Sequence, residues 1–287
     1  MGNFPKVLDG KALSKKILEN IKQEVIEILD RDERSPHLAV ILVGHDPASM
    51  TYVKNKAKKA KRSGLLSSVY EIDDDVSERE LLDVITHLNN DEEIDGILVQ
   101  LPLPKHLNER KILNAINPLK DVDGLHPMNM GRMILGEGFV PCTPKGVMRL
   151  LDEYDVDLEG QHVVIVGRSH LVGRPLVQLM LNKNATVSIA HSRTKHLDQL
   201  TSQADVLVVA IGQKEFIKWQ HVKKGAIVID VGIHRDKDGL HGDVSQDALE
   251  EASMFTPVPG GVGPMTIAML LENTMLAYRE RERLKWN

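Results

Sequence analysis

Short apolar runs alternate with amphipathic segments along most of the chain. The runs are rich in Val and Ile and mostly lack polar alternation, which is typical of strands buried on both faces of a parallel sheet. They lie at residues 38–43, 96–101, 162–166, 185–190, 206–211 and 226–231. The segments between them predict helices at residues 12–29, 49–62, 78–89, 145–153 and 174–182. This alternation predicts an α/β fold with doubly wound parallel sheets.

The order of these elements predicts two domains. A fresh series of apolar runs starts after residue 160, following the strand–helix units of the first half. We therefore expect one α/β domain over residues 1–142 and a second over residues 143–264, with a cleft between them. A last helix, over residues 265–287, follows the final strand, and we expect it to pack back on the first domain.

Two of the predicted helices begin with capping signals. Ser77 and Glu80 form a capping-box pair at the start of the third helix, where each side chain bonds the backbone N–H of the other residue. Thr143 and Pro144 place an N-cap and a first-turn proline before the fourth helix. Both signals support the helix assignments.

The composition is that of a globular protein, and it narrows the classes of partner. Of the 287 residues, 42% are apolar and 27% are charged, which argues against extended disorder. The chain has 36 Lys and Arg residues against 41 Asp and Glu residues, a net charge of −5, so a nucleic acid is not an expected partner. The single cysteine, Cys142, rules out an internal disulfide and a Cys-rich zinc site, which suits a reducing compartment.

The sequence predicts no membrane segment. An uncharged stretch at residues 254–271 is long enough to be considered, but its three prolines and three glycines prevent half of it from being helical. The first residues also lack the apolar run of a signal peptide. We therefore expect a cytoplasmic protein without a membrane partner.

A glycine turn joins a predicted strand directly to a predicted helix at residues 163–175. Gly167, Arg168 and Ser169 follow the strand, and Gly173 opens the helix. Glycines let the backbone approach a pyrophosphate, and a helix N-terminus offers free N–H groups and a positive dipole end. The turn departs from G-x-G-x-x-G, because Ser169 replaces the second glycine and the next glycine comes one residue late. A plain structural turn is the alternative interpretation.

The second strand of this unit bears on the choice of dinucleotide. In NAD-binding folds this strand commonly ends in Asp or Glu, whose carboxylate bonds the ribose hydroxyls. Here residues 185–190 run into His191, Ser192 and Arg193 with no carboxylate. Ser192 and Arg193, with Arg168 as a further candidate, are suited to a ribose phosphate, so the sequence favours NADP. The alternative is an exposed polar loop.

A tyrosine and a lysine share one face of the second predicted helix. Tyr52 and Lys56 are four residues apart and therefore lie side by side. Further lysines at positions 54, 58, 59 and 61 support the alternative of a solvated helix face. Tyr-x-x-x-Lys also occurs in short-chain dehydrogenases, but there it follows the glycine turn, whereas here it precedes the turn by more than 100 residues. That family therefore does not fit.

Three further segments combine polar residues with strand or helix ends, where α/β sheets place their ligands. Gln100 lies near the end of an apolar run, just before prolines that stop the strand. Asp121 and Asp123 lie two positions apart; this pair offers too few ligands for a metal site, and a turn-forming role is the alternative for either carboxylate. A loop dense in Pro and Gly, residues 256–266, opens the last helix and is rigid enough to pass close to a flat or anionic ligand.

Taken together and in this order, these segments resemble the methylenetetrahydrofolate dehydrogenase/cyclohydrolase family, a family of bifunctional folate enzymes. The resemblance covers nearly the whole chain, and its last motif is long and highly specific. Even the departure from the usual glycine fingerprint is the form that this family shows. The matching segments are YVKNK at 52–56, GILVQLPLP at 96–104, KDVDG at 120–124, PCTPKG at 141–146, GRS with VG at 167–173, and PVPGGVGPMT at 257–266.

The resemblance implies roles for particular residues. Lys56 is implied to be the central catalytic residue, with Tyr52 and Gln100 around it and Asp123 binding the pterin. The implied substrate-binding set is Tyr52, Asp123, Pro259, Gly260 and Gly261. The implied cofactor-binding set is Gly167, Arg168, Ser169, Gly173, Ser192, Arg193, Gly212 and Ile233. The resemblance also implies NADP on the second, Rossmann-like domain, folate derivatives between the two domains, and a homodimer formed mainly through the cofactor domain.

The chemistry of the two implied steps agrees with these roles. Removing a hydride from the one-carbon unit leaves a cation that two folate nitrogens stabilise, so alignment matters most. Hydrolysis of that cation moves protons, and a lysine can carry them if burial or a cationic substrate lowers its pKa. Gln100 is neutral and therefore holds Lys56 without raising its pKa as a carboxylate would. Asp123 can accept two hydrogen bonds from the pterin.

We therefore expect an enzyme that oxidises 5,10-methylenetetrahydrofolate with NADP and hydrolyses the product to 10-formyltetrahydrofolate. Two alternatives stay open at this point. A dehydrogenase without hydrolysis has no need to keep both Lys56 and Gln100, and a non-catalytic NADP-sensing protein has no need of either. Cys142 is expected to be a packed side chain, because neither chemical step requires a nucleophile.

Overall fold

The computed structural model describes residues 5–285, which divide into two compact units. One unit comprises the chain up to Ser14 together with Thr143–Thr266, and the other comprises Lys15–Cys142 together with the chain from Ile267 onward. We name them the six-stranded unit and the three-stranded unit after their sheets. The division falls inside two long helices, α1 (Gly10–Asp30) and α10 (Val262–Lys285).

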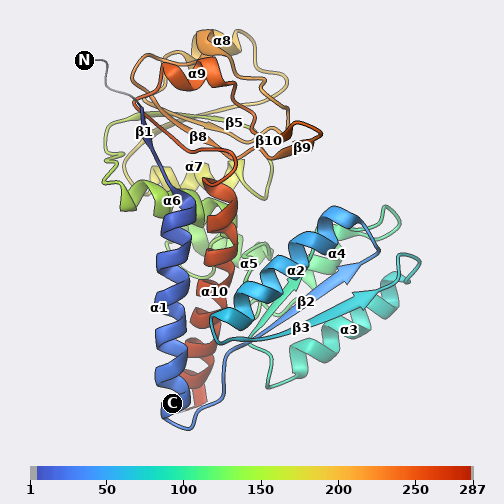
Figure 1. Ribbon diagram of the computed structural model, residues 1–287. Helices are drawn as coiled ribbons and strands as arrows, with labels where there is room; N and C mark the ends of the chain where they lie inside the picture. Colours follow the sequence, from blue (N-terminus) through green and yellow to red (C-terminus); the bar gives the residue numbers. More distant parts are fainter. Residues whose placement is uncertain (1–4, 286–287) are drawn as a thin grey trace. The chain divides into compact units, whose positions relative to one another are not determined.

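The three-stranded unit is built on a short parallel sheet. Its strands are β2 (His37–Val43), β3 (Leu66–Ile72) and β4 (Gly96–Val99), with β2 in the centre. An isolated parallel bridge between Ile97 and Asp121 adds one more segment beside β4. The connecting helices are α2 (Pro47–Arg62), α3 (Glu78–Asn90), α4 (Glu109–Asn114) and α5 (Pro127–Ile134). Helices α2 and α3 flank the sheet on opposite sides (Figure 1).

The two faces of this sheet are buried by different helices. Alternate residues of β2, including Ala39 and Ile41, pack with Leu81, Ile85 and other residues of α3. On the other face, α2 lies against β2 and β3 and buries Val53, Lys56 and Ala60. A lysine thus occupies a position that the helix period reserves for apolar side chains.

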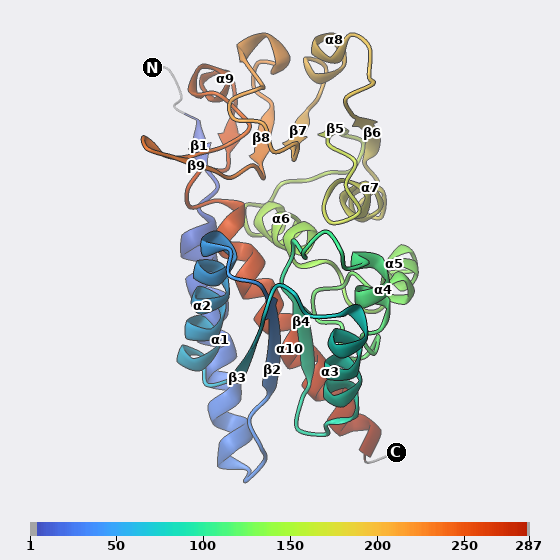
Figure 2. The ribbon, with the colours of Figure 1, turned by 90° about the vertical axis from the view of Figure 1, so that its right-hand side faces the viewer.

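The six-stranded unit holds a fully parallel sheet in the order β1-β11-β8-β7-β5-β6. Figure 2 shows β8, β7, β5 and β6 side by side in this order. The strands are β1 (Lys6–Val7), β5 (His162–Val166), β6 (Thr186–Ala190), β7 (Val206–Val209), β8 (Ile227–Asp230) and β11 (Met254–Phe255). A small antiparallel hairpin comprises β9 (His234–Asp236) and β10 (Gly239–His241).

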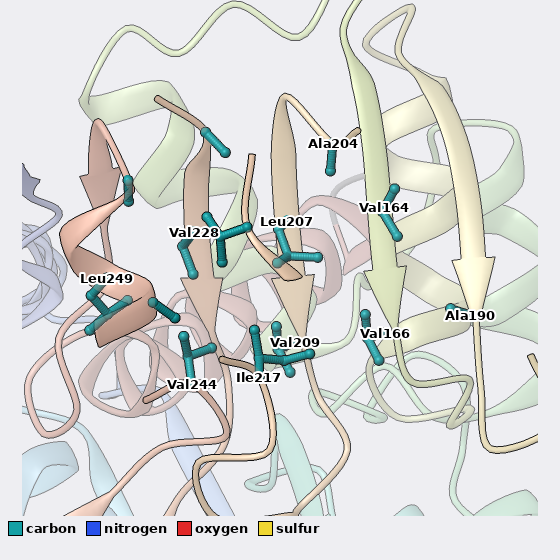
Figure 3. Close-up of a cluster of buried hydrophobic side chains, with 14 residues drawn as sticks. Val164, Val166, Ala190, Ala204, Leu207, Val209, Ile217, Val228, Val244 and Leu249 are labelled. Carbon is teal, nitrogen blue, oxygen red and sulfur yellow. The ribbon is translucent and has the colours of Figure 1, made fainter. Parts of the chain in front are cut away.

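Helices connect these strands as in a doubly wound fold. They are α6 (Cys142–Glu153), α7 (Gly173–Leu181), α8 (Leu197–Thr201) and α9 (Gln246–Glu250), with a 3₁₀ turn at Trp219–His221. Figure 3 shows part of the apolar core, in which side chains of four neighbouring strands meet residues from the loops and α9. The strand order reverses around β5, so the carboxyl ends of β5 and β7 form the switch point at which such sheets bind ligands.

The structure confirms the predicted α/β fold with parallel sheets. Each of the six apolar runs contains a strand, and each of the five predicted helices is present within a few residues. The capping box at Ser77 and Glu80 is formed on both sides. Helix α6, however, begins at Cys142, so Thr143 lies inside the helix and is not its N-cap.

The first strand departs from the predicted domain ranges. The sequence predicts one domain over residues 1–142, but β1 pairs with β11 and therefore belongs to the sheet of the six-stranded unit. Helix α10 contributes buried contacts to the three-stranded unit: Asn273 Nδ2 donates to the carbonyl oxygens of Val122, at 2.9 Å, and Val140, at 3.1 Å. Within residues 5–285, no helix has the length and hydrophobicity needed to cross a bilayer.

Candidate active site

Lys56 is a buried amine held by a neutral partner. Its side chain points from α2 into the three-stranded unit, and the residue is only 5% exposed. The Nζ atom donates to Gln100 Oε1 at 3.0 Å and lies 4.6 Å from the ring centre of Tyr52. Gln100 follows β4, and its Nε2 donates to Leu101 O at 2.7 Å, which fixes the amide oxygen toward the lysine. The three predicted catalytic side chains are therefore together.

The surroundings of Lys56 lower its pKa. Burial is the main cause, because removing water disfavours the ammonium form, while the nearby Asp123 and Cys142 act in the opposite direction. Gln100 carries no charge, so its hydrogen bond adds no ion pair to stabilise the ammonium. A lysine in this setting loses its proton at a lower pH than a lysine in water, which suits a group that exchanges protons.

The other lysines of α2 lie elsewhere. Lys54 and Lys58 are exposed and border a cavity of about 450 Å³ between α2 and β3, whose lining includes none of the predicted site residues. The alternative of a solvated lysine face thus describes Lys54 and Lys58 but not Lys56. Helical spacing separates these faces, since residues two positions apart on a helix do not face each other.

Asp123 lies on a loop that its neighbour Asp121 shapes. Asp121 pairs with Ile97 in the bridge beside β4, and its buried carboxylate accepts from the backbone N–H groups of Leu125, at 3.2 Å, and His126, at 2.8 Å. Asn129 Nδ2 donates to the same carboxylate at 2.8 Å. Burial raises the pKa of Asp121 to about 6. Of the two carboxylates, Asp121 is therefore the turn-forming one, and Asp123, half-buried, is the one whose charge acts on Lys56.

Two further buried groups hold this loop in place. Lys120 Nζ donates to the carbonyl oxygens of Leu88, at 2.9 Å, and Asp91, at 2.6 Å, and so caps the end of α3. Burial lowers the pKa of Lys120 to about 8. The Cys142 thiol donates to Val122 O at 3.3 Å and is buried, in agreement with a packing role. Sequence reasoning did not find Lys120, because its partners are backbone carbonyls 29 and 32 positions away.

A pocket of about 260 Å³ lies at the carboxyl ends of β5, β6 and β7 in the six-stranded unit. Its lining residues are Val166, Gly167, Arg168, His191, Ser192, Leu197, Ala210, Ile211, Gln213 and Phe216. Gly167, Arg168 and Ser192 were predicted from the sequence, whereas Arg193 is exposed and does not line the pocket. His191, Ile211 and Gln213 also line the pocket but are missing from the predicted cofactor-binding set. His191 directly follows the predicted strand at residues 185–190, Ile211 ends the one at residues 206–211, and Gln213 lies two residues after it, so their place at strand ends was the available signal.

The turn after β5 requires its glycines. Gly167 has φ +123°, and a Cβ there would lie 2.2 Å from Ala210 O, so only glycine lets the turn pass the end of β7. A Cβ on Gly173 would lie 2.0 Å from Gly167 O, so α7 starts in direct contact with the turn. Ser169 Oγ accepts from Val172 N at 3.1 Å, which gives the serine at the second glycine position a turn-forming role.

The remaining predicted residues also belong to the six-stranded unit. Gly212 donates its N–H to the buried Asp243, and Ile233 follows β8 and is exposed. Gly260 accepts a hydrogen bond from Lys11 N at 2.8 Å, so the loop with Pro259, Gly260 and Gly261 packs on the start of α1. In the part of the chain that the structure describes, no group of three or more His, Cys, Asp or Glu residues is placed to hold a metal ion.

Comparison with known proteins identifies both halves of the chain. Residues 8–123 match the family model of the tetrahydrofolate dehydrogenase/cyclohydrolase catalytic domain, and residues 141–282 match that of the tetrahydrofolate dehydrogenase/cyclohydrolase NAD(P)-binding domain. The bifunctional protein FolD of Lactococcus lactis subsp. lactis is 55% identical over 274 residues, which is 94% of this chain and 96% of that protein. FolD of Halalkalibacterium halodurans is 54% identical over 276 residues, covering 96% and 99%.

Solved structures give the same answer. The bifunctional FolD enzyme of Campylobacter jejuni aligns with a TM-score of 0.94 at 50% identity, covering 96% of this chain and 99% of that one. The Trypanosoma brucei methylenetetrahydrofolate dehydrogenase-cyclohydrolase, complexed with NADP cofactor and an inhibitor, aligns with a TM-score of 0.94 at 36% identity, covering 99% and 100%. These matches confirm the predicted family and its pairing of dehydrogenase with cyclohydrolase. The chain belongs to the tetrahydrofolate dehydrogenase/cyclohydrolase family.

Proposed function

We propose that Lys56 carries the protons of the second of two reactions in this enzyme. The enzyme oxidises 5,10-methylenetetrahydrofolate to 5,10-methenyltetrahydrofolate with NADP and hydrolyses the product to 10-formyltetrahydrofolate. The observation that carries the proposal is the buried amine of Lys56 bonded to the neutral Gln100. Asp123, Tyr52 and the loop at Pro259, Gly260 and Gly261 are proposed to bind the folate.

The first step needs alignment more than acid or base. NADP, when bound, accepts the hydride from the one-carbon unit, and the two folate nitrogens stabilise the cation that remains. The protein therefore has to hold the folate in one orientation. The Asp123 carboxylate suits this role, because it can accept two hydrogen bonds from the amino-pyrimidine edge of a pterin. The Tyr52 ring offers a surface for stacking.

The second step needs a group that takes up and returns a proton. Water adds to the methenyl carbon and loses a proton, and the bond from that carbon to one ring nitrogen then breaks as this nitrogen gains a proton. A neutral Lys56 amine can accept the first proton and deliver it to the nitrogen. The ammonium formed in between faces the Tyr52 ring, a contact that stabilises a cation. A dehydrogenase without hydrolysis would have no use for this arrangement.

The cofactor pocket has groups suited to the ribose phosphate of NADP. Arg168 and Ser192 line the pocket, and the loop after β6 carries no carboxylate to bind ribose hydroxyls. We propose that these two residues, with Arg193 beside them, bind the phosphate. Gly167, Ser169 and Gly173 form the turn at the start of α7, where backbone N–H groups suit a pyrophosphate. Gly212 and Ile233 are proposed to contact the dinucleotide.

A homodimer through the cofactor domain and a cytoplasmic location also belong to the proposal. The family resemblance supports the dimer. Cys142 is the one cysteine in the sequence and therefore has no second cysteine with which to form a disulfide, which supports a reducing compartment.

Lys56→Gln should separate the two activities. Glutamine keeps much of the length and the hydrogen bonding but cannot carry an ionisable proton, so hydrolysis of methenyltetrahydrofolate should fall by roughly 10²-fold or more. Dehydrogenase activity should stay measurable, and the methenyl compound should accumulate in a spectrophotometric assay. Lys54→Gln serves as the matched control and should leave both activities near normal. Hydrolysis at the wild-type rate in Lys56→Gln would show that the amine is not the proton carrier.

Lys56→Met should make the protein more stable while it abolishes hydrolysis. The folded state lowers the pKa of Lys56, so it binds fewer protons than the unfolded state, and wild-type stability rises as the pH rises toward the ordinary lysine value. Methionine removes this cost and should raise the free energy of unfolding at pH 7.

Urea unfolding at pH 7 and at pH 9.5 measures this gain, which should shrink at the higher pH. Lys54→Met, at an exposed position, should change the free energy by no more than about 0.5 kcal/mol at either pH. A Lys56→Met protein that is less stable than the wild type would contradict the cost assigned to the buried amine.

Arg168→Ala should weaken the binding of NADP without an equal effect on the binding of NAD. Losing a charge-assisted hydrogen bond costs roughly 1.5–3 kcal/mol, so the KM for NADP should rise about 10- to 150-fold. Arg193→Ala should have a smaller effect, because Arg193 is exposed and outside the pocket lining. Steady-state kinetics with each dinucleotide tests both variants. If Arg168→Ala raised the KM for NADP and for NAD by the same factor, Arg168 would not be the residue that recognises the ribose phosphate.

A further inference from the structure

Asp243 is a fully buried carboxylate on which four N–H donors converge. It is 0% exposed and lies in the six-stranded unit between β10 and α9. Its Oδ2 accepts from the backbone N–H groups of Ile211, at 2.8 Å, and Gly212, at 3.0 Å. Its Oδ1 accepts from Gln213 N at 2.8 Å and lies 2.8 Å from His234 Nε2. Three successive N–H groups of one loop thus turn toward a single side chain.

That loop forms one side of the cofactor pocket. Ile211 and Gln213 line the pocket, whereas Asp243 does not. The loop follows β7, at the switch point where the strand order of the sheet reverses. Its backbone N–H groups bond an internal carboxylate, so the loop is shaped before any ligand arrives. Such pre-organisation saves the cost of ordering a loop on binding.

The same carboxylate shapes a second segment of the site. Asp243 lies against Gly232, where an added Cβ would be 2.3 Å from the carboxyl carbon, and it bonds His234. These two neighbours flank Ile233, which is proposed to contact the dinucleotide. Asp243 therefore fixes the backbone on both sides of Ile233 as well as the loop at 211–213.

The backbone of Asp243 is itself held by hydrogen bonds. Its N–H donates to Asp230 Oδ1 at 3.0 Å, and the N–H of Val244 donates to Asp230 Oδ2 at 2.9 Å. Its carbonyl oxygen accepts from Ile217 N at 3.0 Å. These bonds leave the Asp243 backbone little freedom. Contacts with the sheet thus fix the position of the Asp243 carboxylate, and the carboxylate in turn fixes the position of the loop.

We propose that Asp243 is a positioning residue of the cofactor site, which sets the loop at 211–213 and the segment at 232–234 in the shape that binds the dinucleotide. His234 assists by donating the fourth hydrogen bond to the carboxylate. The inference rests on the proposed cofactor pocket. Asp243 acts on the backbone of the pocket and not on the side chains proposed to bind the ribose phosphate. We therefore expect it to affect the binding of NADP and of NAD equally.

Asp243→Asn tests this role. Each carboxylate oxygen of Asp243 accepts hydrogen bonds from two N–H groups. In the variant an NH₂ group replaces one of these oxygens, so its hydrogens face the hydrogens of two donors and no hydrogen bond forms there. The KM for NADP should rise roughly 10- to 150-fold while the dehydrogenase kcat changes by less than about threefold. The KM for NAD, where oxidation with NAD is measurable, should rise by the same factor, unlike in Arg168→Ala. Hydrolysis of added methenyltetrahydrofolate, which requires no dinucleotide, should stay at the wild-type rate.

Two further variants keep the test decisive. Asp238 is exposed and lies in the turn of the β9–β10 hairpin, so Asp238→Asn should leave all of these values unchanged. His234→Ala removes a single donor and should raise the KM for NADP by a smaller factor, and His234→Gln, which keeps an N–H donor, should restore most of it. This pair decides the question if Asp243→Asn does not fold.

An unchanged KM for NADP in a folded Asp243→Asn protein would overturn the proposal. A parallel loss of oxidation and hydrolysis, with a lower melting temperature, would also overturn it, because Asp243 would then support only the fold. Wild-type protein without NADP-dependent oxidation would instead contradict the proposed cofactor pocket itself.

Discussion

The burial of one amine against a neutral amide is the constraint on which the proposed active site depends. Apolar positions of α2 seat the helix on the sheet, and Lys56 takes one of those buried positions. Burial alone favours the uncharged amine, and a carboxylate as its direct partner would cancel that effect. Gln100 gives the side chain a fixed direction without supplying charge. Burial of this amine should therefore cost stability, and we propose that the amine exchanges protons with the substrate.

Both units place their chemistry at the carboxyl ends of parallel strands and hold it there with buried carboxylates. In the three-stranded unit, Asp121 binds backbone N–H groups and so shapes the loop that carries Asp123. In the six-stranded unit, Asp243 does the same for the loop after β7. Each carboxylate exchanges water for several N–H donors, which makes its burial tolerable. The residues that define the loops are thus different from those proposed to touch the ligands.

Much of the fold and part of the site could be predicted from the sequence. The continuous apolar runs indicated the buried strands, but β3 was missed because Ser67, Ser68 and Glu71 interrupt its apolar pattern at the edge of the sheet. The two-residue strands β1 and β11 are too short to produce a pattern. Helical spacing paired Tyr52 with Lys56, whereas the contact of Lys56 with Gln100 joins residues 44 positions apart and followed only from the resemblance.

Other residues had no local signal at all. Asp243 lies about 30 positions from the loop that it holds, and a single aspartate in a polar segment looks like any turn residue. Arg193 carries the positive charge that suits a phosphate, but tertiary structure decides which residues of a loop face a pocket. The pocket lining includes Ser192 and Arg168 and does not include Arg193.

The pKa of Lys56 in the folded enzyme tests the central claim most directly. Lysine labelled with ¹³C at Cε allows each amine to be titrated by NMR, and the signal that disappears in Lys56→Met identifies the residue. The account predicts that this signal titrates below the ordinary lysine pKa of 10.5, and that Gln100→Glu moves it upward by adding a charged partner. A Lys56 signal that titrates at 10.5 or above in the wild-type enzyme would contradict the account.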